Sequence, residues 1–288
     1  MFRQLFYNKK VFAIKPHHRQ YVTVVRHLKK NSIKQQTESM KFIYYNLLFI
    51  LVALTSCSNA SQPNDPIPEH ETFKIQSKQV AEERVINVWT PENYKATKDS
   101  LPVMYMADGG VKEDFPHIAN TLAKLIKENK IKPLILVGIE NTQRRRDLTG
   151  FTEVAKDKEI APVVGGSEKF RAFIKDELFP EINKRYRTTA EKSIIGESAS
   201  GLFVMETFFL TPEMFDNYIA FDPSLWWNNH YLVRTAKEHL AKFPSTEKRI
   251  WFAGSKAEDV SPFTKELAEI DAILENVEAY IFNMQINR

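Results

Sequence analysis

The sequence predicts an α/β fold, in which a mostly parallel sheet carries helices on both faces. Two observations support this prediction. From residue 73 onward, β-rich apolar runs alternate with amphipathic helical segments, and several of these runs lead through short loops into helices. Hydrophobic residues make up 43% of the 288 residues, with 9 glycines and 14 prolines, so collagen-like and low-complexity chains are excluded. A single cysteine excludes an internal disulfide.

The first half of the fold is expected to open with a strand pair at 73–79 and 84–90, which forms an antiparallel edge. Apolar strands at 102–107 and 134–139 follow. The helix between these two strands carries one apolar face, made by Ile118, Leu122, Leu125 and Ile126. The next helix has an apolar stripe made by Phe170, Phe173, Ile174, Leu178 and Ile182, and Ser167 is its expected N-cap.

The same alternation continues in the second half. Strands are expected at 193–195, 218–221, 250–253 and 277–282, and helices at 199–210, 232–243 and 262–276. Ligands of such folds bind beyond the carboxyl ends of the strands. The chemistry is therefore expected in the loops that follow residues 107, 139, 195, 221 and 253.

The first 57 residues differ in charge from the rest of the chain. They contain ten Lys or Arg and one acidic residue, whereas residues 58–288 carry a net charge of −5. Residues 40–56 have a basic start, an apolar core from Phe42 to Leu54 and small residues ahead of Cys57, as in a signal peptide. The run Leu-Thr-Ser-Cys at 54–57 resembles a bacterial lipobox. This resemblance implies a lipidated Cys57 that anchors the protein extracytoplasmically, at the outer membrane or facing the periplasm.

Residues 1–39 are expected to be a spurious extension ahead of a true start at Met40, and residues 57–71 a polar, Pro-rich linker. The alternative for residues 1–39 is a basic arm that binds nucleic acid or anionic lipid. The acidic body counts against a nucleic-acid partner. No metal-ligand spacing and no phosphate-cradling glycine loop occurs in the sequence, so we expect no metal and no other cofactor.

The loop Gly-Glu-Ser-Ala-Ser-Gly at 196–201 joins an apolar strand directly to a helix. This context predicts a nucleophile elbow, a sharp turn that exposes the hydroxyl of Ser198 and aims the next backbone N–H at a developing oxyanion. The expected oxyanion donors are the N–H of Ala199 and one from the Gly109-Gly110 turn. The fifth position of the elbow motif is usually a glycine, and this sequence has Ser200 there. The alternatives are an ordinary serine-capped helix start, and a glycine turn without substrate contact.

Five stretches lie in the same order as in a known family: YMADGG at 105–110, NTQRRRDLT at 141–149, RYRT at 185–188, the elbow, and DPSLWW at 222–227. With them the body resembles the Putative esterase branch of the α/β-hydrolases, which includes siderophore (enterochelin-type) esterases. The resemblance implies the α/β-hydrolase fold, a small-molecule ester as substrate, and hydrolysis of carboxylic esters through an acyl-enzyme on Ser198.

The remaining catalytic groups are harder to find. The candidates for an orienting acid are, in order of preference, Asp259, Glu258 and Asp222. The family places its catalytic histidine after the last strand, yet the only histidines beyond Ser198 are His230 and His239, and each of them suits a surface or packing position. His117, at the start of the first helix, could line the pocket.

We therefore interpret residues 72–288 as an esterase domain that lacks its C-terminal histidine loop and covering helix, and expect this chain to be nearly inactive. The alternative is a non-catalytic, lipid-anchored protein that keeps the hydrolase fold to bind a ligand.

Two segments could set specificity. Arg144, Arg145 and Arg146 could attract an acidic or catecholate acyl group, or else pair with Asp147 or face water. The pair Trp226-Trp227 could wall an aromatic-binding pocket, or pack under the following helix.

Overall fold

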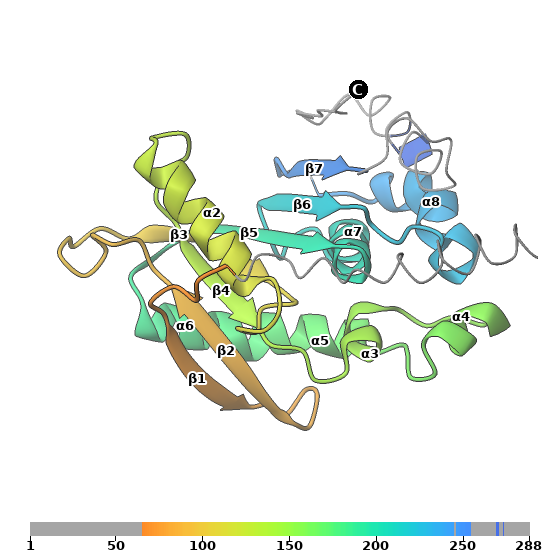
Figure 1. The fold of residues 1–288 in the computed structure, drawn as a ribbon. Coiled ribbons are helices and arrows are strands. Elements are labelled where there is room, and N and C mark those ends of the chain that lie inside the picture. The colour runs from red at the N-terminus through yellow and green to blue at the C-terminus, as the bar shows by residue number, and fades with distance from the viewer. Residues whose placement is uncertain (1–64, 245, 255–268, 271–272, 274–288) are drawn as a thin grey trace, which may run out of the picture. The chain divides into compact units, whose positions relative to one another are not determined.

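The computed structural model describes residues 65–244, 246–254, 269–270 and 273, and these residues form an α/β fold around one sheet (Figure 1). The strands of the described part lie in the order β1-β2-β4-β3-β5-β6-β7. Their bounds are Glu71–Gln76, Glu83–Trp89, Leu101–Met106, Ile135–Ile139, Thr188–Glu197, Asn217–Phe221 and Arg249–Ala253 for β1 to β7. β2 pairs antiparallel with both β1 and β4, and every other pairing is parallel. The mostly parallel sheet with an antiparallel edge is confirmed.

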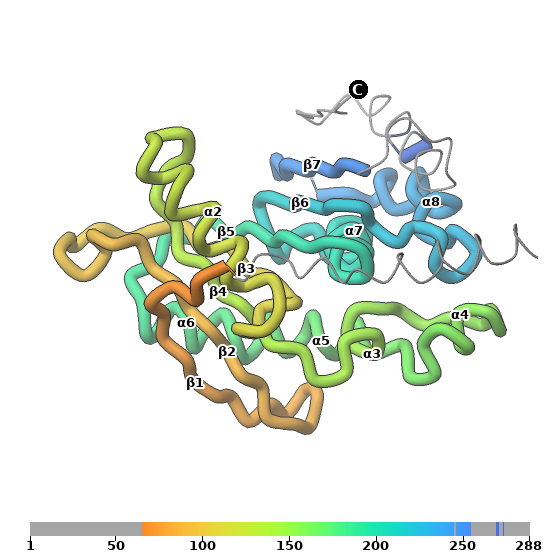
Figure 2. The backbone as a smooth tube through the Cα atoms, viewed as in Figure 1, coloured from red at the N-terminus to blue at the C-terminus, as the bar shows by residue number. Residues whose placement is uncertain are grey.

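Helices connect the strands and cover the sheet (Figure 2). They are α2 (Phe115–Lys127), α3 (Arg144–Leu148), α4 (Ala155–Ile160), α5 (Ser167–Phe173), the π-helical turn η1 (Ile174–Leu178), α6 (Phe179–Arg185), α7 (Ala199–Leu210) and α8 (Trp227–Leu240).

Strand β3 shows that both faces of the sheet are covered. Its alternate residues Met104 and Met106 pack in one apolar cluster with residues of α2, whereas Val103 and Tyr105 pack in a second cluster with residues from α5 through α8. Side chains of a strand alternate between its two faces, so each face of β3 meets helices. This is the packing that the sequence predicts.

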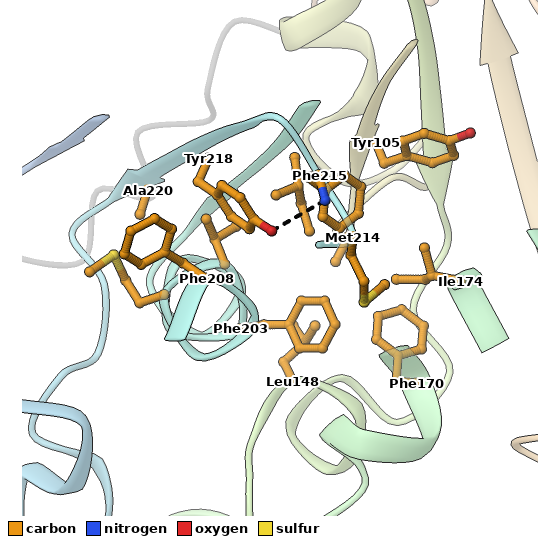
Figure 3. Packing of buried hydrophobic residues seen from close by; sticks show 14 of the residues in the cluster. Tyr105, Leu148, Phe170, Ile174, Phe203, Phe208, Met214, Phe215, Tyr218 and Ala220 are labelled. Atoms are coloured by element: carbon orange, nitrogen blue, oxygen red, sulfur yellow. Dashed lines mark hydrogen bonds between the residues drawn. The ribbon is translucent and has the colours of Figure 1, made fainter. Parts of the chain in front are cut away.

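The second cluster surrounds α7 (Figure 3). Ten of the twelve residues of α7 are buried, and they include Phe203, Phe208 and Glu206. A helix that is apolar on all sides is stable only in the interior. The first residue of α7 directly follows Ser198, so the burial of this helix holds the elbow in place.

The observed bounds differ from the predicted ones where tertiary contacts override local pattern. Strand β5 extends well beyond the predicted 193–195, because Thr188 and Lys192, ahead of that run, pair with Leu101 and Val103 of β3. Gly166, rather than Ser167, is the N-cap of α5, and the prediction of Ser167 was wrong. The predicted single helix from 167 onward contains the π-helical turn ahead of Pro180, whose ring would clash with the carbonyl of the residue four positions earlier.

Several predicted features lie outside the described residues. They are the extension at 1–39, the signal segment with Cys57, the acids Glu258 and Asp259, and the strand at 277–282. Of the helix predicted at 262–276, Glu269, Ile270 and Ile273 are described and are helical. In the described part of the chain, every helix is too short or too polar to span a membrane.

Candidate active site

Ser198 lies in a strained turn between β5 and α7. Its φ and ψ angles are 57° and −114°, it is exposed, and few residues other than glycine adopt a positive φ. The backbone on both sides of the turn is held by the neighbouring strand end: the Ser198 N–H donates to the Phe221 carbonyl over 3.0 Å, and its carbonyl accepts from the Ser224 N–H over 3.1 Å. This is the geometry expected of a nucleophile elbow.

Two glycines make the turn possible. A Cβ on Gly196 would lie 2.6 Å from the backbone of Ser200, and one on Gly201 would lie 2.7 Å from the carbonyl oxygen of Phe221. Helix α7 therefore comes closest to β6 at Gly201, where no side chain fits. The neighbouring position 200 is less crowded and accommodates a serine. That side chain is buried, and its hydroxyl accepts from the Glu197 N–H over 2.8 Å. The serine at the fifth position is thus compatible with the elbow.

Asp108 links the elbow to two other loops at the carboxyl ends of the strands. It follows β3, is 6% exposed, and accepts a 2.8 Å hydrogen bond from the Ser200 hydroxyl. The Arg144 guanidinium donates to both Asp108 oxygens, at 2.5 and 2.8 Å, and the Asn141 amide donates over 2.6 Å. Loops after β3, β4 and β5 therefore share one buried carboxylate.

The electrostatics of this cluster are balanced by Arg144. Burial would raise the pKa of Asp108, but hydrogen bonds and charge from Arg144, with those from Asn141 and Ser200, lower it below its ordinary value. Burial, followed by the charge of Asp114 and those of other nearby acids, raises the pKa of Glu197. Several acidic groups thus act on Glu197, the residue before Ser198, and Arg144 is the compensating cation, which borders the elbow through a 3.5 Å contact to the Glu197 carbonyl.

The expected oxyanion donors differ in whether their N–H groups already have an acceptor. As the first residue of α7, Ala199 has an N–H that no carbonyl within the helix accepts. The Gly109 N–H already donates to the Ile139 carbonyl over 3.0 Å, so this glycine joins β3 to β4. The Gly110 N–H donates to the Glu113 carboxylate over 2.7 Å. Ala199 therefore supplies the unpaired donor, and Gly110 becomes one only when Glu113 moves away.

Of the three candidate acids, the described residues include only Asp222. It follows β6 with φ 40°, its N–H donates to the Ala253 carbonyl over 2.7 Å, and its charge is among those that raise the pKa of Glu197. Asp222 therefore lies near the elbow. Glu258 and Asp259 are outside the described residues.

No histidine in the described part of the chain is hydrogen-bonded to the Ser198 hydroxyl. His117 is exposed, and its Nδ1 lies 2.7 Å from Asp65 Oδ2 at the surface. The ring of His239 packs against Phe209 and Tyr231, and its pKa is lowered by burial. His230 has a left-handed backbone within the first turn of α8. The packing role anticipated for His239 is therefore observed.

The three arginines at 144–146 all have partners inside the protein. Arg144 binds Asp108, Arg145 donates to the Ile160 carbonyl, and Arg146 donates to both Asp147 and Glu82. The predicted pairing with Asp147 is therefore confirmed for Arg146, whereas Arg144 and Arg145 bind partners that were not predicted. Only Arg144 also borders the elbow.

Sequence reasoning missed the cluster around Asp108 and the engagement of Glu113. Asp108, Asn141 and Arg144 lie in the stretches at 105–110 and 141–149 that resemble the family, but the sequence did not predict that they contact one another. Their contact depends on the order of the strands, which places β3 between β4 and β5.

Comparisons with known proteins indicate the family of this chain. The model of the Putative esterase family matches residues 77–279. The chain is 30% identical over 147 residues to the ferri-bacillibactin esterase BesA of Bacillus subtilis, covering 46% of this chain and 51% of BesA. It is 27% identical over 189 residues to the siderophore triacetylfusarinine C esterase of Aspergillus fumigatus, covering 60% and 61%. The chain thus spans about half to three fifths of the length of these relatives.

Among solved structures, an IroE-like serine hydrolase from Shewanella oneidensis aligns with a TM-score of 0.68 at 26% identity, covering 76% of this chain and 74% of that one. The enterobactin esterase of Shigella flexneri, solved in the presence of enterobactin, shares the fold with a TM-score of 0.60 at 16% identity, covering 78% and 55%. With its α/β-hydrolase fold and its match to the family model over residues 77–279, this chain belongs to the Putative esterase family.

Proposed function

We propose that the protein hydrolyses carboxylic esters through an acyl-enzyme on Ser198. The observation that carries this proposal is the backbone of Ser198, which holds a positive φ in an exposed turn between the end of β5 and the buried helix α7. Such strain costs about 1–3 kcal/mol and persists only where surrounding structure enforces it. Hydrogen bonds from β6 and its following loop, together with the glycine contacts, enforce it here.

In the proposed reaction, the Ser198 oxygen attacks the ester carbonyl carbon, its proton passes to a base, and the alcohol leaves as the acyl–serine bond forms. Water then attacks the acyl-enzyme, releasing the acid and restoring the serine. The Ala199 N–H, at the positive end of α7, stabilises the negative oxygen of each tetrahedral intermediate. The acid that orients the base is proposed from Asp259, Glu258 and Asp222, in that order of preference.

The proposed substrates are esters of siderophores. Support comes from the relatives, which are named as esterases of ferri-bacillibactin and of triacetylfusarinine C. Both names describe small molecules with ester bonds. We further propose that the protein acts outside the cytoplasm, anchored through a lipidated Cys57.

The proposal is tested by labelling the full chain with a fluorophosphonate, which phosphonylates an activated serine, and by measuring p-nitrophenyl acetate hydrolysis. We expect an adduct on Ser198 with slow turnover, in keeping with the near-inactivity expected from the sequence, and we expect Ser198→Ala to lose both. Ser100→Ala, an exposed serine ahead of β3, is the matched control and should keep both. An unlabelled wild type, or hydrolysis that survives Ser198→Ala, would contradict the proposal.

The second candidate function is a non-catalytic, lipid-anchored binding protein. The specific observation in its favour is the 2.7 Å hydrogen bond from Gly110 to Glu113, which occupies one of the two expected oxyanion donors. The same experiment separates the candidates, because a non-catalytic protein would show neither labelling at Ser198 nor turnover.

A further inference from the structure

A cavity of about 310 Å³ lies beside α7, between α8 and the loop after α3. Its lining includes the aromatic side chains of Phe151, Trp227 and Tyr231, together with Leu202 and Gly150. A volume of this size is in the range of small-molecule sites, and apolar aromatic walls are typical of them. The proposed reaction takes place at Ser198, which is not part of this lining.

The wall formed by α8 is held in a strained shape. Asn228, Asn229 and His230 have φ angles of 50°, 50° and 58°, so three consecutive residues are left-handed. The Asp157 carboxylate accepts from the Asn228 N–H over 2.9 Å and from the Thr152 hydroxyl over 2.7 Å. Strain that is kept in place in this way is common at binding sites.

The opposite wall is tied down as well. The indole N–H of Trp227 donates to the Gly150 carbonyl over 3.2 Å, so the loop after α3 is bound to the start of α8. The aromatic walls are therefore positioned before a ligand arrives, which lowers the cost of binding.

Besides the amide of Asn228, this lining includes one carboxyl group, that of Glu206. It is 9% exposed, its Oε1 accepts from the Ser167 hydroxyl over 3.1 Å, and its Oε2 has no hydrogen-bond partner in the described part, although Arg171 Nη1 lies 3.5 Å away. A buried carboxylate normally uses more of its acceptor capacity than this. Burial raises its pKa, although Arg171 and Ser167 act in the opposite direction.

The missing side chain of Gly150 leaves space beside this carboxyl. A Cβ placed there would lie 2.7 Å from Glu206 Oε1. A ligand atom in the same place would be within hydrogen-bonding distance. A donor on the ligand fits best, because Arg171 already balances the charge of Glu206, and a charged ligand would leave a buried net charge.

We propose that this cavity binds a neutral aromatic group bearing a hydroxyl donor, with Glu206 as the acceptor and Phe151, Trp227 and Tyr231 as the walls. Ser198, Leu202 and Glu206 are spaced by four residues and share one face of α7, so the carboxyl lies about 12 Å along the helix from the nucleophile. If Ser198 is the nucleophile, as proposed above, this distance means that the cavity binds a part of the ester that is remote from the bond that is cleaved.

The test uses the full chain carrying Ser198→Ala, so that binding is measured without turnover. The probes are catechol and its dimethyl ether, which have the same ring with and without hydroxyl donors, and the dissociation constants are measured by titration calorimetry. We expect catechol to bind about tenfold more tightly than the ether. Gly150→Ala, which places a methyl group beside Glu206, and Glu206→Gln should each reduce this preference to threefold or less.

A third variant tests the aromatic wall. Phe151 is 67% exposed and lines the cavity, so Phe151→Ala should weaken both probes about fivefold without disturbing the core. Val163→Ala is the matched control, because Val163 is 55% exposed and is not among the lining residues. It should leave both dissociation constants unchanged.

The proposal is overturned if catechol and its ether bind equally, or if Gly150→Ala and Phe151→Ala behave like Val163→Ala. Should Glu206→Gln fail to fold in a thermal melt, the other two variants still decide. Failure of the proposed esterase activity is a separate result, since it would show as an unlabelled Ser198 in the wild type while catechol binding persists.

Discussion

The hydroxyl of Ser200 donates a 2.8 Å hydrogen bond to the carboxylate of Asp108, which ties the first turn of α7 to the loop after β3. The same hydroxyl accepts from the N–H of Glu197, the residue immediately before Ser198. A carboxylate 92 residues before Ser200 in the sequence thus supports the turn that carries Ser198, the proposed nucleophile. Arg144 in turn supports this carboxylate.

Replacing Asp108 with Asn should destabilise the protein in a pH-dependent way. The pKa of Asp108 is lowered on folding, so its contribution to stability is complete above its ordinary pKa of 3.8 and is lost as the pH falls through the lower folded value. We expect Asp108→Asn to reduce the free energy of unfolding by about 1.5–3 kcal/mol at pH 7, the range for hydrogen bonds to charged groups. The difference from the wild type should shrink below about pH 4, as measured by urea denaturation.

Glu238→Gln provides a control for this measurement. Glu238 also has a lowered pKa, through Lys242, but both side chains are exposed, that of Glu238 on α8 and that of Lys242 just beyond its end. Exposed pairs contribute little to stability, so the control should match the wild type at each pH. A deficit of Asp108→Asn that stays constant from pH 7 to pH 3 would show that the charge of Asp108 is not what stabilises the elbow.

Replacing Gly201 with Ala should displace α7 from β6. The added methyl would lie 2.7 Å from the Phe221 carbonyl oxygen, which is backbone and cannot rotate away. We expect a loss of about 1–3 kcal/mol in the free energy of unfolding, and fluorophosphonate labelling of Ser198 slowed by about tenfold. Leu210→Ala, at the exposed end of the same helix, should change neither quantity. Unaltered labelling of Gly201→Ala would mean that the elbow tolerates a shift of α7.

The elements that could be predicted are those whose residues carry their own signal. Helix α7 has the bounds expected from its sequence, because a run of apolar residues after a Gly-rich turn has few alternatives. Strand β5 begins earlier than predicted, since its polar residues Thr188 and Lys192 join the sheet only through pairing with β3. The left-handed residues 228–230 carry no periodic signal, and Asp157, distant in sequence, holds the first of them.

The candidate site divides in the same way. Ser198 and its glycines could be predicted, because the elbow is a local turn between two adjacent elements. The support from Asp108 could not, because it depends on the spatial order of β3, β4 and β5. Glu206 did leave a signal, since it is the one charged residue in an otherwise apolar helix, but its contact with Ser167 joins segments 39 residues apart.

Replacing Cys57 with Ser should release the protein from the membrane if residue 57 is lipidated. The prediction rests on the lipobox-like run at 54–57 and the apolar segment ahead of it. In bacterial cells, the wild type should label with a palmitate analogue and sediment with membranes, whereas Cys57→Ser should do neither. Ser58→Ala, next to the lipobox-like run, should behave as the wild type. A wild type that takes up no palmitate analogue would refute the anchor.

Removing the Glu113 carboxylate should free the Gly110 N–H for an oxyanion. Glu113 accepts from Gly110 over 2.7 Å and from the Asn141 side chain over 2.9 Å, so it competes with a negatively charged intermediate for the same donor. An aligned oxyanion donor is worth about a hundredfold in rate, and partial realignment should make Glu113→Ala label Ser198 at least threefold faster than the wild type. Lys112→Ala, an exposed neighbour in the same turn, should leave the rate unchanged. If Glu113→Ala labels more slowly instead, the carboxylate holds the glycine turn in its productive position, and Gly110 depends on Glu113 rather than competing with it.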